Sequence, residues 1–544
     1  MQRQAHRPIS LPLTLALLLA APVYAQAQEA PRTAAEVSGF ERTSTHAEVV
    51  AFVRALSGLP HADRLRVESA GTTNEGRDLL TVTVGAPLPR ETRAAEAGTR
   101  LRILINANIH GGEVEGKEAV QQVLREFALG EHEDLLAGAV VVFVPVYNAD
   151  GNDDLSRRNR VSQNGPEEGV GKRPNAQGLD LNRDFVKVES PECQGLLALV
   201  NRWDPHIFMD LHTTNGSSHG YHLTYSPSLA TNVDADLDGF VRTTFLPEVR
   251  AATFTNHGFR TFDYGNFSRG EEKSWETYDH RPRFGTNYMG LRNRLSVLSE
   301  AYSYVSFEKR VAVTRAFVLE NLRAAVGHAE EIRRLCAQAD RRALERDSSV
   351  RFAWDTQLAD GHVQDVLVGT LSSVEIEGIG TRRVVESGFH AEPMVVRDGF
   401  TSTKSVALPA AWVLPDPSAA VTAALAHHGI EVTRLATAAE VEVRTFVIAE
   451  LERAERPFQG HHEVRLTGEW TSVQRTLPAG ALVIPANQRL GRVAAQLLEP
   501  ESEDSLATWN FFDERLEPAV PGEPRPVYPV LRLESVEGLV MGGD

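Results

Sequence analysis

The sequence predicts an α/β protein in which a mixed central sheet is flanked by helices on both faces. Short apolar runs such as 139–146 are nearly continuous and rich in β-branched residues, as in strands buried on both faces. These runs alternate along the chain with segments of helical periodicity. Several of them end in polar, titratable residues, at the place where open α/β sheets bind ligands. A small β domain and a C-terminal α/β region are expected beyond this sheet.

The N-terminus has the pattern of a secretory signal peptide. Two arginines precede an apolar core over about residues 11–23, and the AQA motif at 25–27 offers a small-x-small cleavage site. This core is short for a membrane span. We therefore predict a signal peptide over 1–27 and a secreted or periplasmic protein that does not span a membrane after cleavage. A polar linker is expected over 28–42.

Composition limits the classes of function that this chain can have. The chain has 544 residues and a net charge of −17, which argues against a nucleic-acid partner because such partners need a basic surface. Its length allows several domains. The only two cysteines, Cys193 and Cys336, are too few for a disulfide framework, and buried thiols are favoured over a bond between them.

The first large domain is expected over residues 43–345. Its predicted elements are, in order, a helix at 45–56, a hairpin of strands at 65–70 and 79–84, a strand at 101–105 leading into a helix from 113, a strand at 139–146, a helix at 191–203, strands at 206–211 and 220–225, a helix at 234–253, a strand at 295–300 and a helical tract at 307–343. The polar loop at 148–178 is long enough to suggest a functional role.

Two further regions follow this domain. Alternating apolar residues and glycine-rich turns predict the small β domain over 350–414, and a mixed texture predicts the C-terminal α/β region over 415–544. The histidine pairs 427–428 and 461–462 in this last region are expected at the surface.

Four polar residues fall at the ends of predicted strands of the first domain. His110 and Glu113 follow the strand at 101–105, His212 ends a later strand, and Glu300 ends the last one. Two histidines and a glutamate form a catalytic Zn²⁺ set that leaves one coordination position open. A second acid could then serve as a general base. The His-x-x-Glu spacing alone is a weak signal, so the prediction depends on all four residues converging.

These residues belong to ordered motifs that resemble those of the zinc carboxypeptidase family, typified by carboxypeptidases A and B. His110-Gly-Gly-Glu113 resembles the first zinc motif, and Asp210-Leu211-His212 resembles the strand of the second histidine. The segment 178–185, GLDLNRDF, resembles the motif that binds the substrate carboxylate, although many relatives have another polar residue at Asp184. Asn148-Ala149-Asp150-Gly151 resembles the segment before the catalytic arginine, and Glu300 matches the catalytic glutamate.

The resemblance implies a mixed sheet of the zinc carboxypeptidase type over 43–345, one Zn²⁺ per chain and a role for each matching residue. His110, Glu113 and His212 would hold the metal, and Glu300 would act as general base. Arg157 would stabilise the oxyanion, with its neighbours Arg158 and Arg160 as alternatives.

The remaining roles concern substrate binding. Asn182 and Arg183 would hold the terminal carboxylate of the substrate, for which a planar guanidinium is suited. Asp180 would orient a zinc histidine. Tyr278 resembles the mobile tyrosine that closes over substrate; Tyr288 is its competitor, and a core position is the alternative for both. Asp210 is interpreted as structural. Residues 270–290 should line the specificity pocket, where Arg281 and Arg283 could favour acidic side chains but are expected to face solvent.

Together these features predict an exported zinc metallocarboxypeptidase that acts on peptides with a free C-terminal carboxylate. The alternative is a zinc amidase or deacylase acting on cell-wall peptides or acyl-amino acids. A non-catalytic peptide-binding protein is a third possibility, which the intact set of His110, Glu113, His212 and Glu300 disfavours.

Overall fold

The computed structural model describes residues 29–214, 216–270, 272–345, 350–386, 388–516 and 526–542. The predicted signal peptide over 1–27 lies outside the described residues. Within the described ranges, no helix combines the length and the apolar character that a membrane crossing requires.

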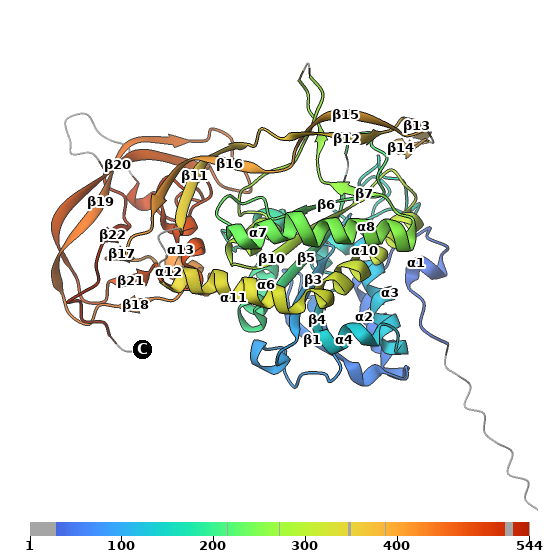
Figure 1. The fold of residues 1–544 in the computed structure, drawn as a ribbon, viewed down its shortest axis with the longest axis horizontal. Helices are drawn as coiled ribbons and strands as arrows, with labels where there is room; N and C mark the ends of the chain where they lie inside the picture. The colour runs from blue at the N-terminus through green and yellow to red at the C-terminus, as the bar shows by residue number, and fades with distance from the viewer. Residues whose placement is uncertain are drawn as a thin grey trace, which may run out of the picture.

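A mixed eight-stranded sheet forms the centre of the first domain, in the order β1-β2-β4-β3-β5-β10-β6-β7 (Figure 1). Strands β4, β3, β5 and β10 run parallel, and β1 and β2 pair antiparallel with their neighbours. Strand β6 is antiparallel to β10 and parallel to β7. The predicted mixed sheet is therefore confirmed. The strands are β1 Leu65–Thr72, β2 Asp78–Val84, β3 Leu101–Ala107, β4 Ala139–Val144, β5 Ile207–Thr214, β6 Leu223–Pro227, β7 Thr261–Asp263 and β10 Leu295–Tyr302.

Helices cover both faces of this sheet, as the near-continuous apolar runs predict. Successive side chains of a strand point to opposite faces, so Ile103 and Ile105 of β3 join one core and Leu104 joins the other. The helices are α2 His46–Ala55, α3 Glu115–Leu129, α4 Glu133–Gly138, α5 Ala149–Asp153, α6 Pro191–Trp203, α7 Ala235–Phe240, α8 Leu246–His257, α9 Gly285–Leu291, α10 Phe307–Gly327 and α11 Ala329–Glu345. Helices α2, α3, α8 and α10 pack together on one face, and α6 and α9 lie on the other.

Two segments differ from the expectation. The described part of the expected linker contains a helix, α1 Ala34–Val37, whose Glu36 forms an ion pair with Arg125 of α3 at 2.6 Å. The helix expected over 234–253 is interrupted by a π-helical turn at Val241–Phe245. Pro247 explains the interruption because it has no N–H to continue the α-helical ladder.

The region expected as a small β domain is a long antiparallel ribbon, which we call the β arm (351–407). It leaves the C-terminal lobe at the left of Figure 1 and crosses the top of the first domain. Its middle joins that domain, since β15 pairs in parallel with β9 (Ser274–Glu276), which in turn pairs with β8 (Asn266–Phe267). The arm consists of β11 Arg351–Leu358, β12 His362–Val368, β13 Leu371–Ile376, β14 Gly380–Val385, β15 His390–Arg397 and β16 Phe400–Ala407.

The C-terminal lobe has the expected α/β character. Its six-stranded sheet has the order β18-β21-β17-β22-β19-β20. One hydrophobic core runs from Leu104 and Phe208 of the central sheet to Trp412 and Trp509 of the lobe, so the lobe and the first domain pack as one body. The elements are β17 Ala411–Leu414, α12 Ala419–His428, β18 Thr433–Arg434, β19 Ala439–Arg453, β20 Val464–Leu477, β21 Leu482–Pro485, α13 Gly491–Leu498 and β22 Leu531–Leu533.

Candidate active site

The turn after β3 brings His110 and Glu113 to the same side. Asn108 adopts a left-handed backbone (φ 62°), and its side-chain amide donates to the carbonyls of His110 and Glu113. The Glu113 amide also donates to the His110 carbonyl at 2.9 Å, which closes the turn. Glycine is required at 111 because a Cβ there would collide with the backbone of Gly151. The tight, closely packed turn therefore explains the glycine between His110 and Glu113 in the His-Gly-Gly-Glu sequence.

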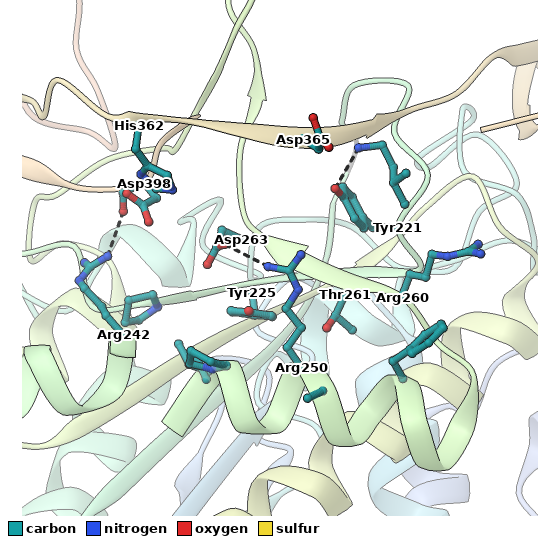
Figure 2. Close-up of a pocket in the computed structure, with 16 residues that line it drawn as sticks. Tyr221, Tyr225, Arg242, Arg250, Arg260, Thr261, Asp263, His362, Asp365 and Asp398 are labelled. Atoms are coloured by element: carbon teal, nitrogen blue, oxygen red, sulfur yellow. Dashed lines mark hydrogen bonds and ion pairs between the residues drawn. The ribbon is translucent and has the colours of Figure 1, made fainter. Parts of the chain in front are cut away.

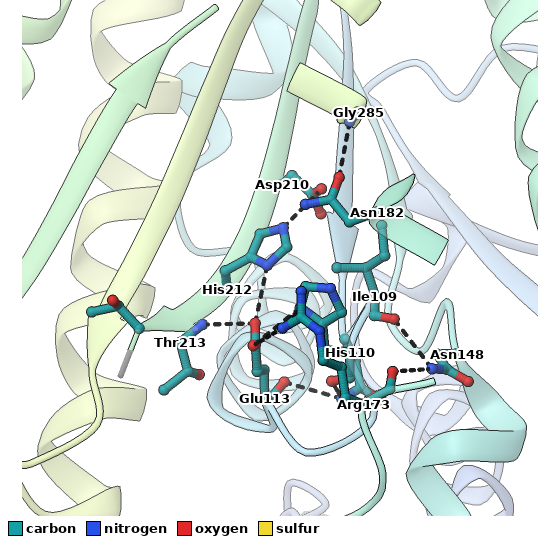
Figure 3. Close-up of polar contacts among 12 residues, drawn as sticks. Ile109, His110, Glu113, Asn148, Arg173, Asn182, Asp210, His212, Thr213 and Gly285 are labelled. Atoms are coloured by element: carbon teal, nitrogen blue, oxygen red, sulfur yellow. Dashed lines mark hydrogen bonds and ion pairs between the residues drawn. The ribbon is translucent and has the colours of Figure 1, made fainter. Parts of the chain in front are cut away.

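His110, Glu113 and His212 converge on one point, as Figure 3 shows. One ligand atom from each lies within 4.8 Å of the others. The His110 Nδ1 is 3.0 Å from Glu113 Oε1, and the His212 Nδ1 is 3.0 Å from Glu113 Oε2. All three side chains are buried. The structure thus brings the three predicted metal ligands together.

A carboxylate holds the other ring nitrogen of each histidine. Asp180 Oδ1 is 3.0 Å from His110 Nε2, and Asp210 Oδ2 is 3.0 Å from His212 Nε2. Asn106 Nδ2 donates to the second oxygen of Asp210 at 3.0 Å and so fixes that carboxylate. Asp180 therefore lies where the sequence predicts an orienting acid, and Asp210, interpreted as structural, lies at the same distance from the second histidine.

This donor set fits Zn²⁺. Each Nδ1 faces the Glu113 carboxylate while each Nε2 contacts an aspartate, an arrangement that fixes the tautomer of zinc-binding histidines. Burial alone would raise the pKa of Glu113, but His110 and Arg160 lower it well below its ordinary value. Glu113 is thus held as an anion among the nitrogen donors, and three protein ligands leave one position open for catalysis.

Glu300 approaches this cluster from the neighbouring strand. It is the register partner of His212 in the β5–β10 pair, so both side chains leave the sheet on the same face. Burial raises the pKa of Glu300 to about 8, and Glu113 contributes in the same direction while His212 opposes it. The predicted general base therefore lies beside the predicted metal ligands.

Arg157, by contrast, is not brought to the cluster. Its side chain is exposed, and its Nε donates to the carbonyl of Glu167 at 3.0 Å. Its neighbour Arg160 points inward instead: Nη1 donates to Glu113 Oε1 at 2.9 Å and Nη2 to the Thr213 carbonyl at 2.8 Å. Because the 156–163 segment makes tight turns, the Arg157 and Arg160 side chains point in different directions. Sequence spacing alone could not show this.

A second arginine at the cluster, Arg173, was missed by the sequence reasoning. Its Nε donates to Asp180 at 2.9 Å, and its Nη1 lies 3.4 Å from His110 Nδ1 and 3.6 Å from Glu113 Oε1. The side chain is 42% exposed, so the guanidinium borders both the buried donors and the solvent side. Its place in the long polar loop, shortly before the GLDLNRDF motif, was the available signal.

Asn182 and Arg183 lie on a short turn that begins at Asp180. The Asn182 side-chain oxygen accepts from the Gly285 amide at 2.9 Å (Figure 3). The Arg183 guanidinium lies 4.0 Å from the centre of the Phe284 ring, and Asp180 is 3.8 Å away. Because Asp180 already pairs with His110 and Arg173, the charge of Arg183 is only partly compensated. An anionic group of a substrate would complete the compensation of this positive charge.

The two candidate tyrosines lie in different surroundings. Tyr288 is fully buried, and its hydroxyl is 2.7 Å from His428 Nδ1, so it belongs to the contact with the C-terminal lobe. Tyr278 packs edge-on against Tyr264 and Phe284, with its hydroxyl 3.1 Å from that of Thr286. Burial raises the pKa of Tyr278, and the negative charge of Glu300 contributes in the same direction.

Three residues expected at the surface are buried or paired. Arg283 is 2% exposed and contacts Asp504 at 3.0 Å and Glu463 at 2.6 Å, while Arg281 pairs with Asp279 at 2.5 Å. His428 is completely buried. The arginines find acidic partners, and His428 contacts Tyr288 and the Val186 carbonyl of the first domain; sequence reasoning could not foresee these partners. Cys193 and Cys336 are both buried free thiols, as favoured.

A cavity of about 600 Å³ lies under the β arm, against α8 and the edge strand β7 (Figure 2). Arg250 in its wall is 3.7 Å from Asp263. None of the predicted site residues lines it. A second cavity of about 600 Å³ lies between the C-terminal lobe and the segment from Tyr278 to Arg283. Tyr278 lines this second cavity.

The parallel strands and the His–Glu–His set at their carboxyl ends define a metal-dependent enzyme of the α/β class. Carboxypeptidase 2 from Trichophyton equinum and its counterpart from Trichophyton rubrum are each 22% identical to this chain, over 465 and 460 residues, covering 80% of the chain and 77% of each relative. Among solved structures, a metallo-carboxypeptidase from Burkholderia cenocepacia is 18% identical with a TM-score of 0.39, covering 53% of this chain and 70% of its own.

A carboxypeptidase A from Helicoverpa armigera is 14% identical with the same TM-score of 0.39, covering 54% of this chain and 75% of its own. The sequence model of the zinc carboxypeptidase family matches residues 50–217, the stretch that holds His110, Glu113 and His212. Over this stretch the chain is similar to the zinc carboxypeptidase family.

Proposed function

We propose that this protein removes the C-terminal residue of peptides, with His110, Glu113 and His212 holding one Zn²⁺. The observation that carries the proposal is the convergence of these donors within 4.8 Å, with an aspartate behind each histidine. When bound there, zinc would lower the pKa of water and polarise the carbonyl of the scissile bond. The other steps fall to side chains of the chain itself.

Glu300 would move the proton. Its carboxylate shares a face of the sheet with His212 and is partly exposed, so it can accept a proton from the attacking water. The same carboxylic acid can then donate that proton to the leaving amine. No second acid is needed for this exchange, because the two transfers occur in sequence at one carboxyl group.

Arg173 is the better candidate for the oxyanion role that the resemblance assigns to Arg157. Its guanidinium contacts Asp180 and lies within 3.6 Å of Glu113, and it is partly open to solvent, where substrate would enter. Arg160 is already engaged by Glu113 and the Thr213 carbonyl. A fixed cation close to the reacting carbonyl stabilises the charge that develops on its oxygen.

The substrate would be recognised by its free terminal carboxylate. Arg183 offers an incompletely paired guanidinium over the Phe284 ring, and Asn182 is held beside it by Gly285. Bidentate pairing with a carboxylate is the interaction for which arginine is suited. Tyr278, at the edge of this group, would pack against the bound terminal residue.

The test compares a peptide with a free C-terminus and the same peptide with an amidated one. Release of the terminal amino acid from the free form alone, abolished by a chelator and restored by Zn²⁺, is the expected result. Arg183→Ala should raise KM for the free form at least tenfold. Equal hydrolysis of both forms would contradict the assignment and favour the amidase alternative.

The proposal includes export. The pattern at 1–27 supports it, and N-terminal sequencing of protein recovered from outside the cytoplasm tests it. A mature N-terminus near residue 28 is expected, and an intact Met1 in that material would contradict the prediction.

A further inference from the structure

A hairpin of the C-terminal lobe reaches the segment that carries the substrate-binding pair. We call residues 454–463 the capping loop; it connects β19 to β20. Its ends are tied by a hydrogen bond from the Ala454 amide to the Glu463 carbonyl. At its tip, Phe458 and His461 exchange both backbone hydrogen bonds, at 2.8 and 3.0 Å. The tip is therefore a two-residue β-turn formed by Gln459 and Gly460.

Gln459 occupies a demanding position in this turn. Both central residues have positive φ, 51° at Gln459 and 84° at Gly460, as tight hairpin turns require. Glycine tolerates this conformation, and asparagine or aspartate is the usual alternative. A glutamine there costs about 1 kcal/mol of backbone strain. Such strain at a side chain that reaches another segment suggests a role for the side chain itself.

That side chain contacts the carboxylate-binding segment. Gln459 Oε1 accepts a hydrogen bond from the Asp180 amide at 2.8 Å. Asp180 is the first residue of the turn that presents Asn182 and Arg183, and its carboxylate accepts from the Asn182 amide at 3.0 Å. The same carboxylate contacts His110 Nε2. One amide of the C-terminal lobe thus fixes the start of a segment that serves both substrate and metal.

The capping loop is itself firmly anchored. His461 Nε2 is 2.8 Å from Glu189 Oε1, and Glu463 is 2.6 Å from the buried Arg283. Arg283 also stacks on Trp509 at 4.5 Å, so the base of the loop is continuous with the shared core. Glu189 and Arg283 belong to the first domain, so the position of Gln459 is set by contacts other than its own hydrogen bond to Asp180.

We propose that Gln459 is a positioning residue for the terminal-carboxylate site, and that the C-terminal lobe completes this site through the capping loop. The inference rests on the proposed carboxypeptidase function. Without the hydrogen bond to Asp180, the turn carrying Asn182 and Arg183 loses its outer support. The expected effect falls on substrate binding, because the proton transfer of Glu300 does not involve this turn.

Two variants of the full-length protein separate the hydrogen bond from the turn. Gln459→Met keeps the length of the side chain and removes the acceptor. Gln459→Asn suits the left-handed backbone better than glutamine but is one methylene shorter, so it should not reach Asp180. Arg456→Met, at an exposed position on the same loop, is the matched control.

The measurements are kcat and KM for a peptide with a free C-terminus, zinc content, and amide hydrogen exchange of the peptide covering 178–185. Both Gln459 variants should raise KM about three- to tenfold, which corresponds to one hydrogen bond, with kcat within about twofold of wild type. Exchange of the 178–185 peptide should become faster in both. Arg456→Met should match wild type in each measurement.

Several outcomes would overturn the inference. KM and exchange equal to wild type in both variants would show that the contact does not matter. A normal KM in Gln459→Asn together with a raised KM in Gln459→Met would assign the effect to the turn and not to the hydrogen bond. If wild type itself released no terminal residue, the proposed function would fail, whereas an active wild type with unaffected variants would refute this inference alone.

Discussion

His212 and Glu300 are register partners on the adjacent parallel strands β5 and β10. This single pairing places a proposed metal ligand and the proposed general base on one face of the sheet, although 88 positions separate them in the sequence. Both residues lie near the carboxyl ends of their strands, and this edge of the parallel strands is where the two side chains can face a common substrate.

Glu300→Gln should retain the metal and lose turnover. Glutamine preserves the shape of the side chain but cannot accept the proton from the attacking water. We expect kcat to fall by about 10²- to 10⁴-fold with roughly one zinc per chain retained. Metal analysis and steady-state kinetics of the same preparation provide the check, and wild-type turnover in this variant would remove Glu300 from the mechanism.

Asp180→Asn and Asp210→Asn should each weaken zinc binding. Each aspartate holds the Nε2 of one ligand histidine at 3.0 Å, so its loss frees the ring to rotate and makes it less basic. A loss of about 10- to 100-fold in zinc affinity is expected. Competition with a chromogenic chelator measures it, and Asp63→Asn, at an exposed position, serves as control. Unchanged affinity in both variants would show that the two carboxylates do not support the metal.

Arg173→Ala should reduce kcat far more than Arg157→Ala. Arg173 lies beside His110 and Glu113, whereas Arg157 contacts only a backbone carbonyl at the loop surface among its described hydrogen bonds. We expect a loss of about 10²- to 10³-fold for Arg173→Ala, partly recovered by Arg173→Lys. Arg157→Ala should stay close to wild type. The reverse ranking would restore the role that the family resemblance gives to Arg157.

His428 should make the protein less stable in acid. Burial lowers the pKa of His428 to about 3, and the charge of Arg292 contributes, while the Val186 carbonyl opposes the shift. Between about pH 3 and 6.5 the unfolded chain binds this proton and the folded chain does not, so the stability from this group is full above 6.5 and is lost as pH falls. The slope is about 1.4 kcal/mol per pH unit for one such proton.

His428→Gln tests this, because glutamine can still bond to Tyr288 and to the Val186 carbonyl, the two partners of the imidazole. The midpoint of thermal unfolding should fall less steeply between pH 6 and 4 in the variant than in wild type. Parallel profiles for the two proteins would contradict the assignment. Replacing the exposed His390 instead should leave the profile unchanged.

The candidate metal site could be predicted from the sequence because its signals are local. His110 and Glu113 share one turn, and His212 and Glu300 each end an apolar run, so strand periodicity alone locates them. Arg173 could not be chosen in the same way, since its role depends on how a long loop folds back on Asp180. Gln459 lies 279 positions from its partner, and no local pattern connects the two.

The β arm shows a different limit of prediction from sequence, which concerns how strands are arranged. Alternation of apolar and polar residues is the same in a ribbon as in a small sheet domain, so the pattern over 350–414 predicted strands correctly but not their arrangement. β15 pairs with β12 of the arm on one side and with β9 of the first domain on the other, so the ribbon is joined to that domain along its length. The partner of an edge strand is a property of the whole fold.

The tip of the arm also bears on how the protein matures during synthesis. Arg382 pairs with Glu167 at 3.0 Å, and the Arg383 amide donates to the Ser162 carbonyl at 3.1 Å, so the tip packs on the segment that presents Arg160. That segment leaves the ribosome more than 200 residues before its packing partner. A nascent chain that has not yet extended past about residue 385 therefore lacks these contacts. The segment that presents Arg160 gains this support only after the β arm has been synthesised.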